Sequence, residues 1–219
     1  MKKRITALLC ATMLVGLCSC ASKNKNADYE VGSTIQLGTY IQDGDVAESI
    51  DWIVLTVEDD RALLVTEKII DCQRYHSEYS GCTWETCYMR EWLNSEFYST
   101  AFSSEDAAKI LETVITNEDN PTFGTEGGND TTDRVFLLSY SEAESYLSED
   151  SLRAEVTAYA ISNGVIANDG VSAWWLRTPG TSGRHRACRV MDSGVIAASG
   201  CDVENISTGV RAAVWVSVE

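Results

Sequence analysis

The sequence predicts one α+β domain in which strands from both ends of the chain share a sheet and helices pack around it. β-rich runs lie between residues 34 and 68 and again between 173 and 218, and segments with helical spacing lie between them. The chain has 219 residues, of which 44% are hydrophobic, enough for one domain with a substantial core. Strands, then helices, then strands is an order typical of the α+β class.

Three strands are expected near the start of this domain. Thr34–Ile41 alternates apolar and polar residues, which is the pattern of a half-buried strand. Asp51–Val57 and Arg61–Lys68 are β-rich and flank the acidic turn Glu58-Asp59-Asp60. Two such runs around a short turn predict an antiparallel hairpin.

Helices are expected in the middle of the chain. Thr83–Phe97 repeats aromatic residues at helical spacing, and Ser103–Leu111 opens with a capping serine. A short helix is expected to open at Ser141–Glu144. Another is expected over Ser151–Asn163, with Gly164 as its C-cap.

The remaining segments predict one long loop and five strands. Asn117–Asp133 is rich in Asn, Asp, Gly and Thr, which are common loop residues. Turns are expected at Ser193-Gly194 and at Gly200. The predicted strands are Val135–Ser139, Ala173–Thr178, Ala187–Met191, Val195–Ser199 and Val210–Val218.

The first 19 residues have the features of a lipoprotein signal peptide. A basic start precedes an apolar run over Ile5–Leu17, and Leu17-Cys18-Ser19-Cys20 fits a lipobox. Cleavage after Ser19 makes Cys20 the lipidated first residue of the mature chain. Residues 20–32 then form the lipidated start and a polar tether, and residues 33–219 form the domain. The expected location is the extracytoplasmic face of the cell membrane, with attachment through the lipid.

Composition narrows the partners and the redox chemistry. The formal net charge is −16, which argues against nucleic acid as a partner. Five cysteines remain after the lipobox, an odd number that leaves at least one thiol unpaired within the chain. They are Cys72, Cys82, Cys87, Cys188 and Cys201.

Four motifs carry a resemblance to a known family. They are Trp84-Glu85-Thr86 with Arg90–Asn94, Asp133–Ser139, Trp174–Gly180 and Gly209–Ala213. In this order they resemble the bacterial domain of unknown function 6273, over most of residues 34–217. The resemblance implies a fold like that of C-type lectins and formylglycine-generating enzymes. The chain departs from the family at Ala212, where the family usually has proline.

A related group of proteins suggests where a ligand would bind. Variable proteins of diversity-generating retroelements have this kind of fold and carry hypervariable ligand contacts between a Trp-rich strand and a final Gly-Val-Arg or Gly-Phe-Arg strand. Most polar residues between Arg177 and Arg211 here are reachable from an Asn codon by changing only its adenines, and this segment lacks Lys, Gln and Trp. That composition fits diversification, although exposed loops are also rich in such residues.

Charge points to the same segment. Residues 26–176 hold seven Lys/Arg and 29 Asp/Glu, whereas residues 177–211 hold five Arg and three acids. Arg is enriched at recognition surfaces, where Lys is depleted. Arg177 and Arg211, inside strand motifs, are expected to pair with the domain's own acids. For the other three arginines, recognition and internal pairing are equally compatible with the sequence.

The predicted function is a non-enzymatic binding protein, without cofactor or metal, whose partner is an extracellular protein or glycan. The second member of the Trp174-Trp175 pair either lines the face or packs under a helix. Cys188 and Cys201 are either products of diversification or a disulfide. The predicted ligand-binding residues are Trp175, Thr181, Ser182, Arg184, His185, Arg186, Arg189, Asp192, Ser193, Ser199, Asp202 and Asn205.

Two other functions are also compatible with the sequence. One is an oxidase of the formylglycine-generating type that uses Cys82 and Cys87, although that family keeps its cysteine pair near the final strands. The other is a structural envelope module without a ligand. A calcium site at Asp119, Asp130 and Asp133 is less favoured than an ordinary structured loop, because the spacing is not that of an EF-hand.

Overall fold

The computed structural model describes residues 29–181 and 185–218. The expected signal peptide, Cys20, and the candidate residues Ser182 and Arg184 lie outside this range. No helix in the described residues is long and apolar enough to cross a membrane.

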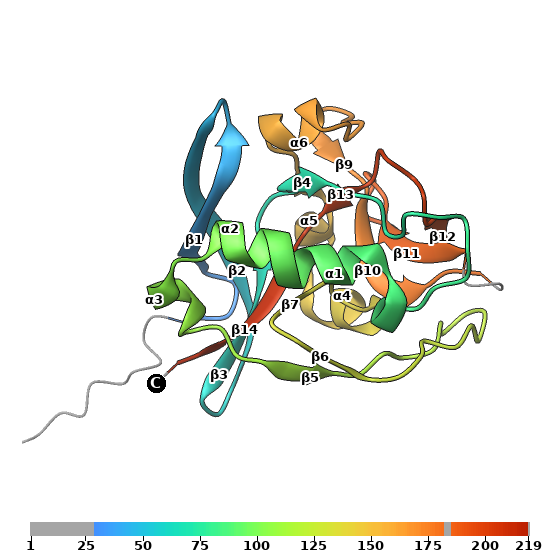
Figure 1. Ribbon diagram of the computed structural model, residues 1–219, viewed down its shortest axis with the longest axis horizontal. Coiled ribbons are helices and arrows are strands. Elements are labelled where there is room, and N and C mark those ends of the chain that lie inside the picture. The colour runs from blue at the N-terminus through green and yellow to red at the C-terminus, as the bar shows by residue number, and fades with distance from the viewer. Residues whose placement is uncertain (1–28, 182–184, 219) are drawn as a thin grey trace, which may run out of the picture.

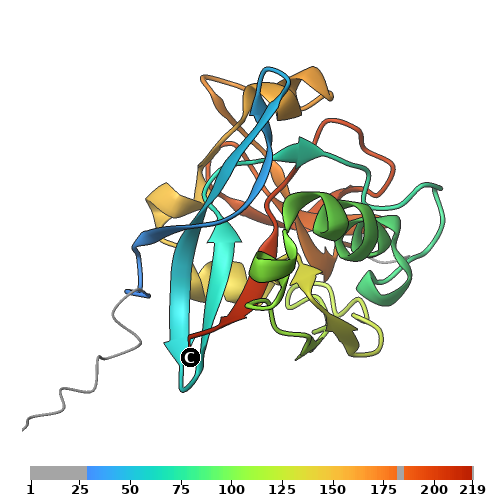
Figure 2. The same ribbon diagram turned by 60° about the vertical axis from the view of Figure 1, so that its left-hand side comes forward.

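The first of two five-stranded sheets joins the two ends of the domain. Its strand order is β1-β2-β3-β14-β7. These strands are β1 (Thr34–Asp43), β2 (Val46–Glu58), β3 (Arg61–Thr66), β14 (Ala213–Ser217) and β7 (Val135–Phe136). Trp215 of β14 lies opposite Leu63 of β3 in antiparallel register, which confirms that early and late strands share a sheet (Figure 1). Figure 2 shows the red strand β14 alongside the cyan strand β3.

The second sheet is built mainly from the last third of the chain. Its order is β12-β11-β10-β13-β4, and two small two-stranded sheets accompany it. The five strands are β4 (Asp71–Cys72), β10 (Trp174–Pro179), β11 (Arg186–Val190), β12 (Ile196–Asp202) and β13 (Gly209–Val210). The small sheets pair β5 (Thr113–Ile115) with β6 (Thr131–Asp133) and β8 (Ala154–Glu155) with β9 (Val171–Ser172).

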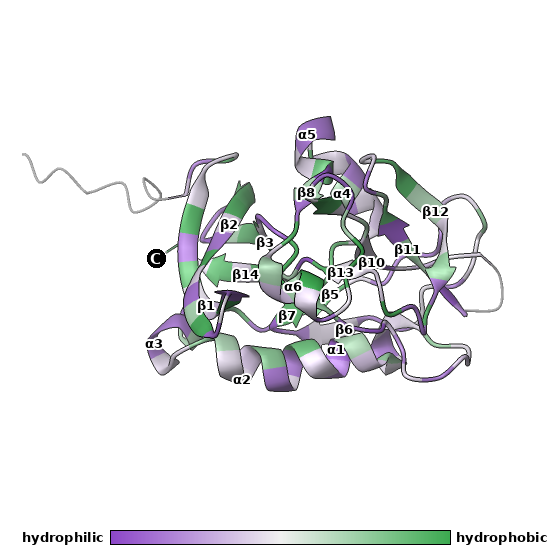
Figure 3. Cartoon of the chain, turned by 90° about the horizontal axis from the view of Figure 1, so that it is seen from above, coloured by the Kyte–Doolittle hydropathy of each residue, from purple (hydrophilic) through white to green (hydrophobic). Residues whose placement is uncertain are grey.

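Short helices lie on two sides of the sheets. A nearly continuous helical stretch runs along one side, and α4 and α5 lie on the opposite side (Figure 3). The stretch contains α1 (Tyr88–Trp92), a π-helical turn (Leu93–Phe97) and α2 (Tyr98–Ala101), preceded by a 3-10 turn (Trp84–Thr86). The other helices are α3 (Ser104–Ala107), α4 (Tyr140–Tyr146), α5 (Glu149–Leu152) and α6 (Ala158–Ser162).

Three sequence predictions about local structure are wrong. The expected helix Ser151–Asn163 is split, because residues 154–155 pair with β9 as strand β8 and Thr157 caps a new helix. The expected strand Val210–Val218 breaks at Arg211-Ala212, so that β13 and β14 join different sheets. Gly200 lies within β12 at a register shift, with φ +68, rather than in a turn.

Tryptophan side chains fill the space between the elements. Trp52, Trp84, Trp174 and Trp175 are each 0% exposed. Each buried indole N–H has an acceptor; that of Trp52 donates to the Leu37 carbonyl at 2.8 Å. Burial of rings this large supplies much of the apolar area that stabilises the fold. Two of these indoles, Trp174 and Trp175, belong to β10, a strand of the second sheet.

Candidate functional site

The predicted binding residues that the structure brings together lie where β11 and β12 meet the loop that follows β4. The Thr181 amide donates to the Ser199 carbonyl at 3.2 Å, and the Val203 amide donates to the His185 carbonyl at 3.0 Å. The loop reaches the same place, because the His76 amide donates to the Val203 carbonyl at 2.9 Å. We call this surface the distal face; its described members are Tyr79, Thr181, His185, Arg186, Ser199 and Asp202.

An aromatic stack forms part of the distal face. The rings of Tyr79 and His185 lie 4.8 Å apart with an interplanar angle of 16°. Tyr79 is 60% exposed, so much of its ring faces solvent. Sequence reasoning placed His185 here but missed Tyr79, which lies more than 100 residues away in the chain. Only the fold brings these two segments together.

Arg186, the residue after His185, presents a charge that is partly exposed to solvent. Its Nη2 donates to the Gly200 carbonyl at 2.9 Å, and its Nε lies 3.6 Å from the Asp202 carboxylate. The Arg186 side chain is 42% exposed and that of Asp202 is 60% exposed. The pair is therefore open to solvent, and both charges remain accessible to a ligand.

Arg189 does not join Arg186 on the distal face. The two residues are three positions apart in β11, so their side chains project to opposite faces of the sheet. Arg189 Nη1 instead lies 3.3 Å from the Thr208 hydroxyl, beside β13. The single cluster of arginines that the sequence predicts is therefore divided by the sheet.

Three further predicted residues lie elsewhere. Asp192 and Ser193 lie at the β11–β12 turn, at the opposite end of this hairpin from the Arg186–Asp202 pair. There the Asp192 carbonyl accepts from Arg153 and its carboxylate accepts from Asn168. Asn205 shapes its own loop, since its Oδ1 accepts from the Ser207 amide at 2.9 Å.

Trp175 is a core residue, and its assignment to the ligand face is wrong. Its side chain is 0% exposed, and its indole N–H donates to the Gln73 carbonyl at 3.1 Å. Its ring lies 5.7 Å from that of Tyr75. Trp174, on the other face of β10, is also 0% exposed. Both faces of β10 are covered, so neither indole is available to a ligand.

The buried Asn120 amide holds the strand ends beneath the distal face. Asn120 is 2% exposed, and its Nδ2 donates to the carbonyls of Pro179 at 2.7 Å and Ala198 at 2.9 Å. Its Oδ1 accepts from the amides of Thr122 and Phe123, each at 2.9 Å. The 117–130 loop therefore braces the distal face, a role that no local sequence pattern reveals.

Cys188 and Cys201 are free thiols, so the suggested disulfide is not formed. Ala187, not Cys188, lies opposite Cys201 in the ladder, and adjacent residues of a strand project to opposite faces. Cys188 Sγ instead donates to the Pro179 carbonyl at 3.2 Å. Burial raises the pKa of the Cys188 thiol to about 12, which keeps it protonated and unreactive.

Cys82 and Cys87 are also free and buried. Burial raises the pKa of Cys82 to about 12 and raises the pKa of Cys87 further. The Cys87 sulfur accepts from the Arg90 amide at 3.4 Å and so caps α1. In the folded chain burial therefore keeps both thiols protonated, which disfavours either as a nucleophile.

The acidic residues of the long loop have structural partners. Asp133 accepts from the Trp84 indole at 2.9 Å and pairs with Arg90 at 2.6 Å. Asp119 accepts from the Gly127 amide at 2.9 Å, and Asp130 accepts from the Asn117 amide at 3.3 Å. Across residues 29–181 and 185–218, no group of three His, Cys, Asp or Glu residues is arranged to hold a metal ion.

The two arginines in strand motifs differ in how they are stabilised. Arg177 is 3% exposed and makes a bidentate pair with Glu142, with N–O distances of 2.5 and 2.9 Å. This confirms the expected internal pairing. Arg211 is 0% exposed, but its bonds go to backbone carbonyls of Thr66 and Ser151 rather than to an acid. The expected partner for Arg211 is therefore wrong.

Comparison with known proteins assigns this α+β chain to a family of domains. The family model described as "Domain of unknown function (DUF6273)" matches residues 59–218, and the chain belongs to this family. No curated protein and no solved structure matches the chain.

Proposed function

We propose that this protein is a lipid-anchored, extracytoplasmic binding protein that captures a protein or glycan on its distal face. The observation that most supports this proposal is the Tyr79–His185 stack, together with the solvent-exposed Arg186–Asp202 pair that follows His185 in the chain. Aromatic and Arg side chains dominate the binding energy at recognition surfaces. Loops held on a rigid scaffold are common places for such contacts.

The scaffold under the distal face supports this proposal. Asn120 ties the β10 end to β12, and Thr181 is hydrogen-bonded to Ser199. A surface fixed before binding loses little conformational freedom when a ligand arrives. The shared sheet of early and late strands is also consistent with a C-type-lectin-like fold, which we propose for this domain.

We further propose that the segment around the distal face is diversified by a retroelement. Thr181, His185, Arg186, Ser199 and Asp202 are all reachable from an Asn codon through adenine changes. A reverse transcriptase gene nearby, with a near-copy of the coding segment for residues 177–211 that differs only at adenines, is the expected finding. A genomic neighbourhood without such a copy removes this part of the proposal.

Binding of the full chain to a glycan array and to intact bacterial and host cells tests the function. Arg186→Ala is expected to weaken binding by about tenfold or more without changing the Tm, because Arg186 is half-exposed. Arg134→Ala is the matched control, since Arg134 is similarly exposed and paired with Glu112 away from the distal face. Equal binding by the two variants would place the ligand elsewhere.

A further inference from the structure

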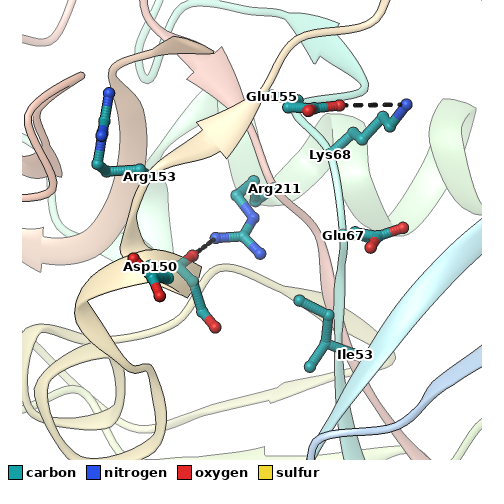
Figure 4. A pocket seen from close by; sticks show the side chains of 8 residues that line it. Ile53, Glu67, Lys68, Asp150, Arg153, Glu155 and Arg211 are labelled. Atoms are coloured by element: carbon teal, nitrogen blue, oxygen red, sulfur yellow. Dashed lines mark hydrogen bonds and ion pairs between the residues drawn. The ribbon is translucent and has the colours of Figure 1, made fainter.

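A pocket lies away from the distal face, between the end of β3, α5 and β8. It has a volume of about 460 Å³. Figure 4 shows Arg211 between Asp150 on one side and Glu67 with Ile53 on the other, with Lys68 and Glu155 paired above it. Arg153, which also lines the pocket, contacts Asp192 at the opposite end of the β11–β12 hairpin from the distal face.

Arg211 lines this pocket, and one nitrogen of its guanidinium lacks a hydrogen-bond partner in the described part of the chain. The side chain is 0% exposed; its Nε donates to the Thr66 carbonyl at 2.9 Å and its Nη1 to the Ser151 carbonyl at 2.8 Å. Its guanidinium lies 4.7 Å from the centre of the Trp174 ring. These contacts fix the guanidinium plane. The Nη2 group is buried and has no hydrogen-bond partner among the described residues.

A buried guanidinium without a carboxylate partner is costly. Removing a charge from water is compensated only by an opposite charge and by full hydrogen bonding. Burial lowers the pKa of Arg211 to about 9, and the nearby Glu67 carboxylate only partly opposes this effect. Arg177, by comparison, is equally deep and has a bidentate acid partner. The carboxylate of a bound ligand would give Arg211 the opposite charge and the hydrogen-bond acceptors that Glu142 provides for Arg177.

The whole lining of the pocket, Arg211 included, carries charges of both signs. Three acids and three bases line it: Glu67, Asp150, Glu155, Lys68, Arg153 and Arg211. A ligand that is only anionic would meet three carboxylates, and one that is only cationic would meet Arg211. The lining therefore matches a molecule with one group of each sign.

We propose that this pocket binds a small zwitterion of the amino-acid class, with its carboxylate on the Arg211 guanidinium and its ammonium group toward Glu67. The carboxylate accepts from Nη2 and supplies the missing countercharge. The ammonium donates to the Glu67 carboxylate, which lines the same cavity. This site is independent of the distal face and of the ligand bound there.

The proposal is tested by titrating the full chain with L-amino acids and with their carboxamides, which keep the ammonium and lose the carboxylate. Thermal unfolding and calorimetry are expected to show a rise in Tm and measurable binding for one or more amino acids. The matching amide is expected to bind about tenfold or more weakly. Absence of binding at about 10 mM, or equal binding of acid and amide, overturns the proposal.

Variants then locate the site without relying on Arg211, whose removal threatens folding because the residue is fully buried. Ile53→Trp is expected to fill the cavity and abolish amino-acid binding, and Glu67→Gln to weaken it about fivefold or more. Glu144→Gln is the control, since Glu144 is exposed on α4 and does not line the pocket. Native affinity in both pocket variants would overturn the proposal.

Discussion

Replacing Asn120 with alanine tests whether the long loop braces the distal face. Asn120 makes four hydrogen bonds of 2.7 to 2.9 Å, two as donor to strand carbonyls and two as acceptor from loop amides. Each net hydrogen bond is worth about 1 kcal/mol. Asn120→Ala is therefore expected to lower the free energy of unfolding by about 4 kcal/mol, a large part of the stability of an ordinary domain.

Urea unfolding followed by circular dichroism measures this loss. Asn129→Ala is the matched control in the same loop, because the Asn129 side chain makes one exposed hydrogen bond, to Glu85 at 3.0 Å. The control is expected to lose about 0.5 kcal/mol or less. If Asn120→Ala lowers the free energy of unfolding by less than about 1 kcal/mol, the loop does not brace the distal face and only connects its neighbouring strands.

Three further predictions concern the cysteines. Cys201 is the least buried of the five described thiols, so a thiol reagent should modify it first in the folded chain; Cys201→Ser should remove this fast reaction and Cys188→Ser should not. The pKa of Cys72 is raised to about 11 and those of Cys82 and Cys188 to about 12. Above pH 9 the unfolded chain therefore loses these protons first. Deprotonation of each thiol in the unfolded chain should then lower the free energy of unfolding by about 1.4 kcal/mol per pH unit, up to the pKa of that thiol in the folded chain. Arg211 has a lowered pKa in the folded chain, so it should raise the free energy of unfolding by a similar amount per pH unit. Urea unfolding at about pH 8 and pH 10 should show a net fall that is smaller in Cys188→Ala, and an equal fall in both chains would contradict the assignment. Finally, the native chain should incorporate radiolabelled fatty acid in cells and Cys20→Ser should not; label in both would place the lipid elsewhere.

Local patterns in the sequence predicted those elements whose signal is contained in a few residues. The β2–β3 hairpin follows from two β-rich runs and the turn at Asp59, which has φ 46. Ser103 was correctly predicted to cap the helical turn that follows it. The predicted helix over Ser151–Asn163 is wrong because the sequence pattern placed Thr157 in the interior of a helix. In the structure, pairing of β8 with β9 interrupts the helix, and Thr157 caps the next one.

The site was predicted less completely, because it depends on tertiary contacts. The charge asymmetry of the sequence points to the segment that forms β11 and β12, but strand alternation separates Arg189 from Arg186. The sequence allowed Trp175 to be assigned to the ligand face because no local pattern shows that Tyr75 and the loop after β4 pack over that face of β10. Tyr79 and Asn120 are distant in sequence from the strands they contact, and no motif marks either residue.

The affinity of Tyr79→Ala for the ligand found on the array or on cells tests the central claim most directly. Tyr79 is 60% exposed and its ring stacks on His185, so its loss removes the aromatic surface while the core stays intact. We predict an affinity loss of about tenfold or more, with native affinity in the control Tyr146→Ala, a partly exposed tyrosine on α4. Native affinity in Tyr79→Ala would contradict recognition at this end of the second sheet.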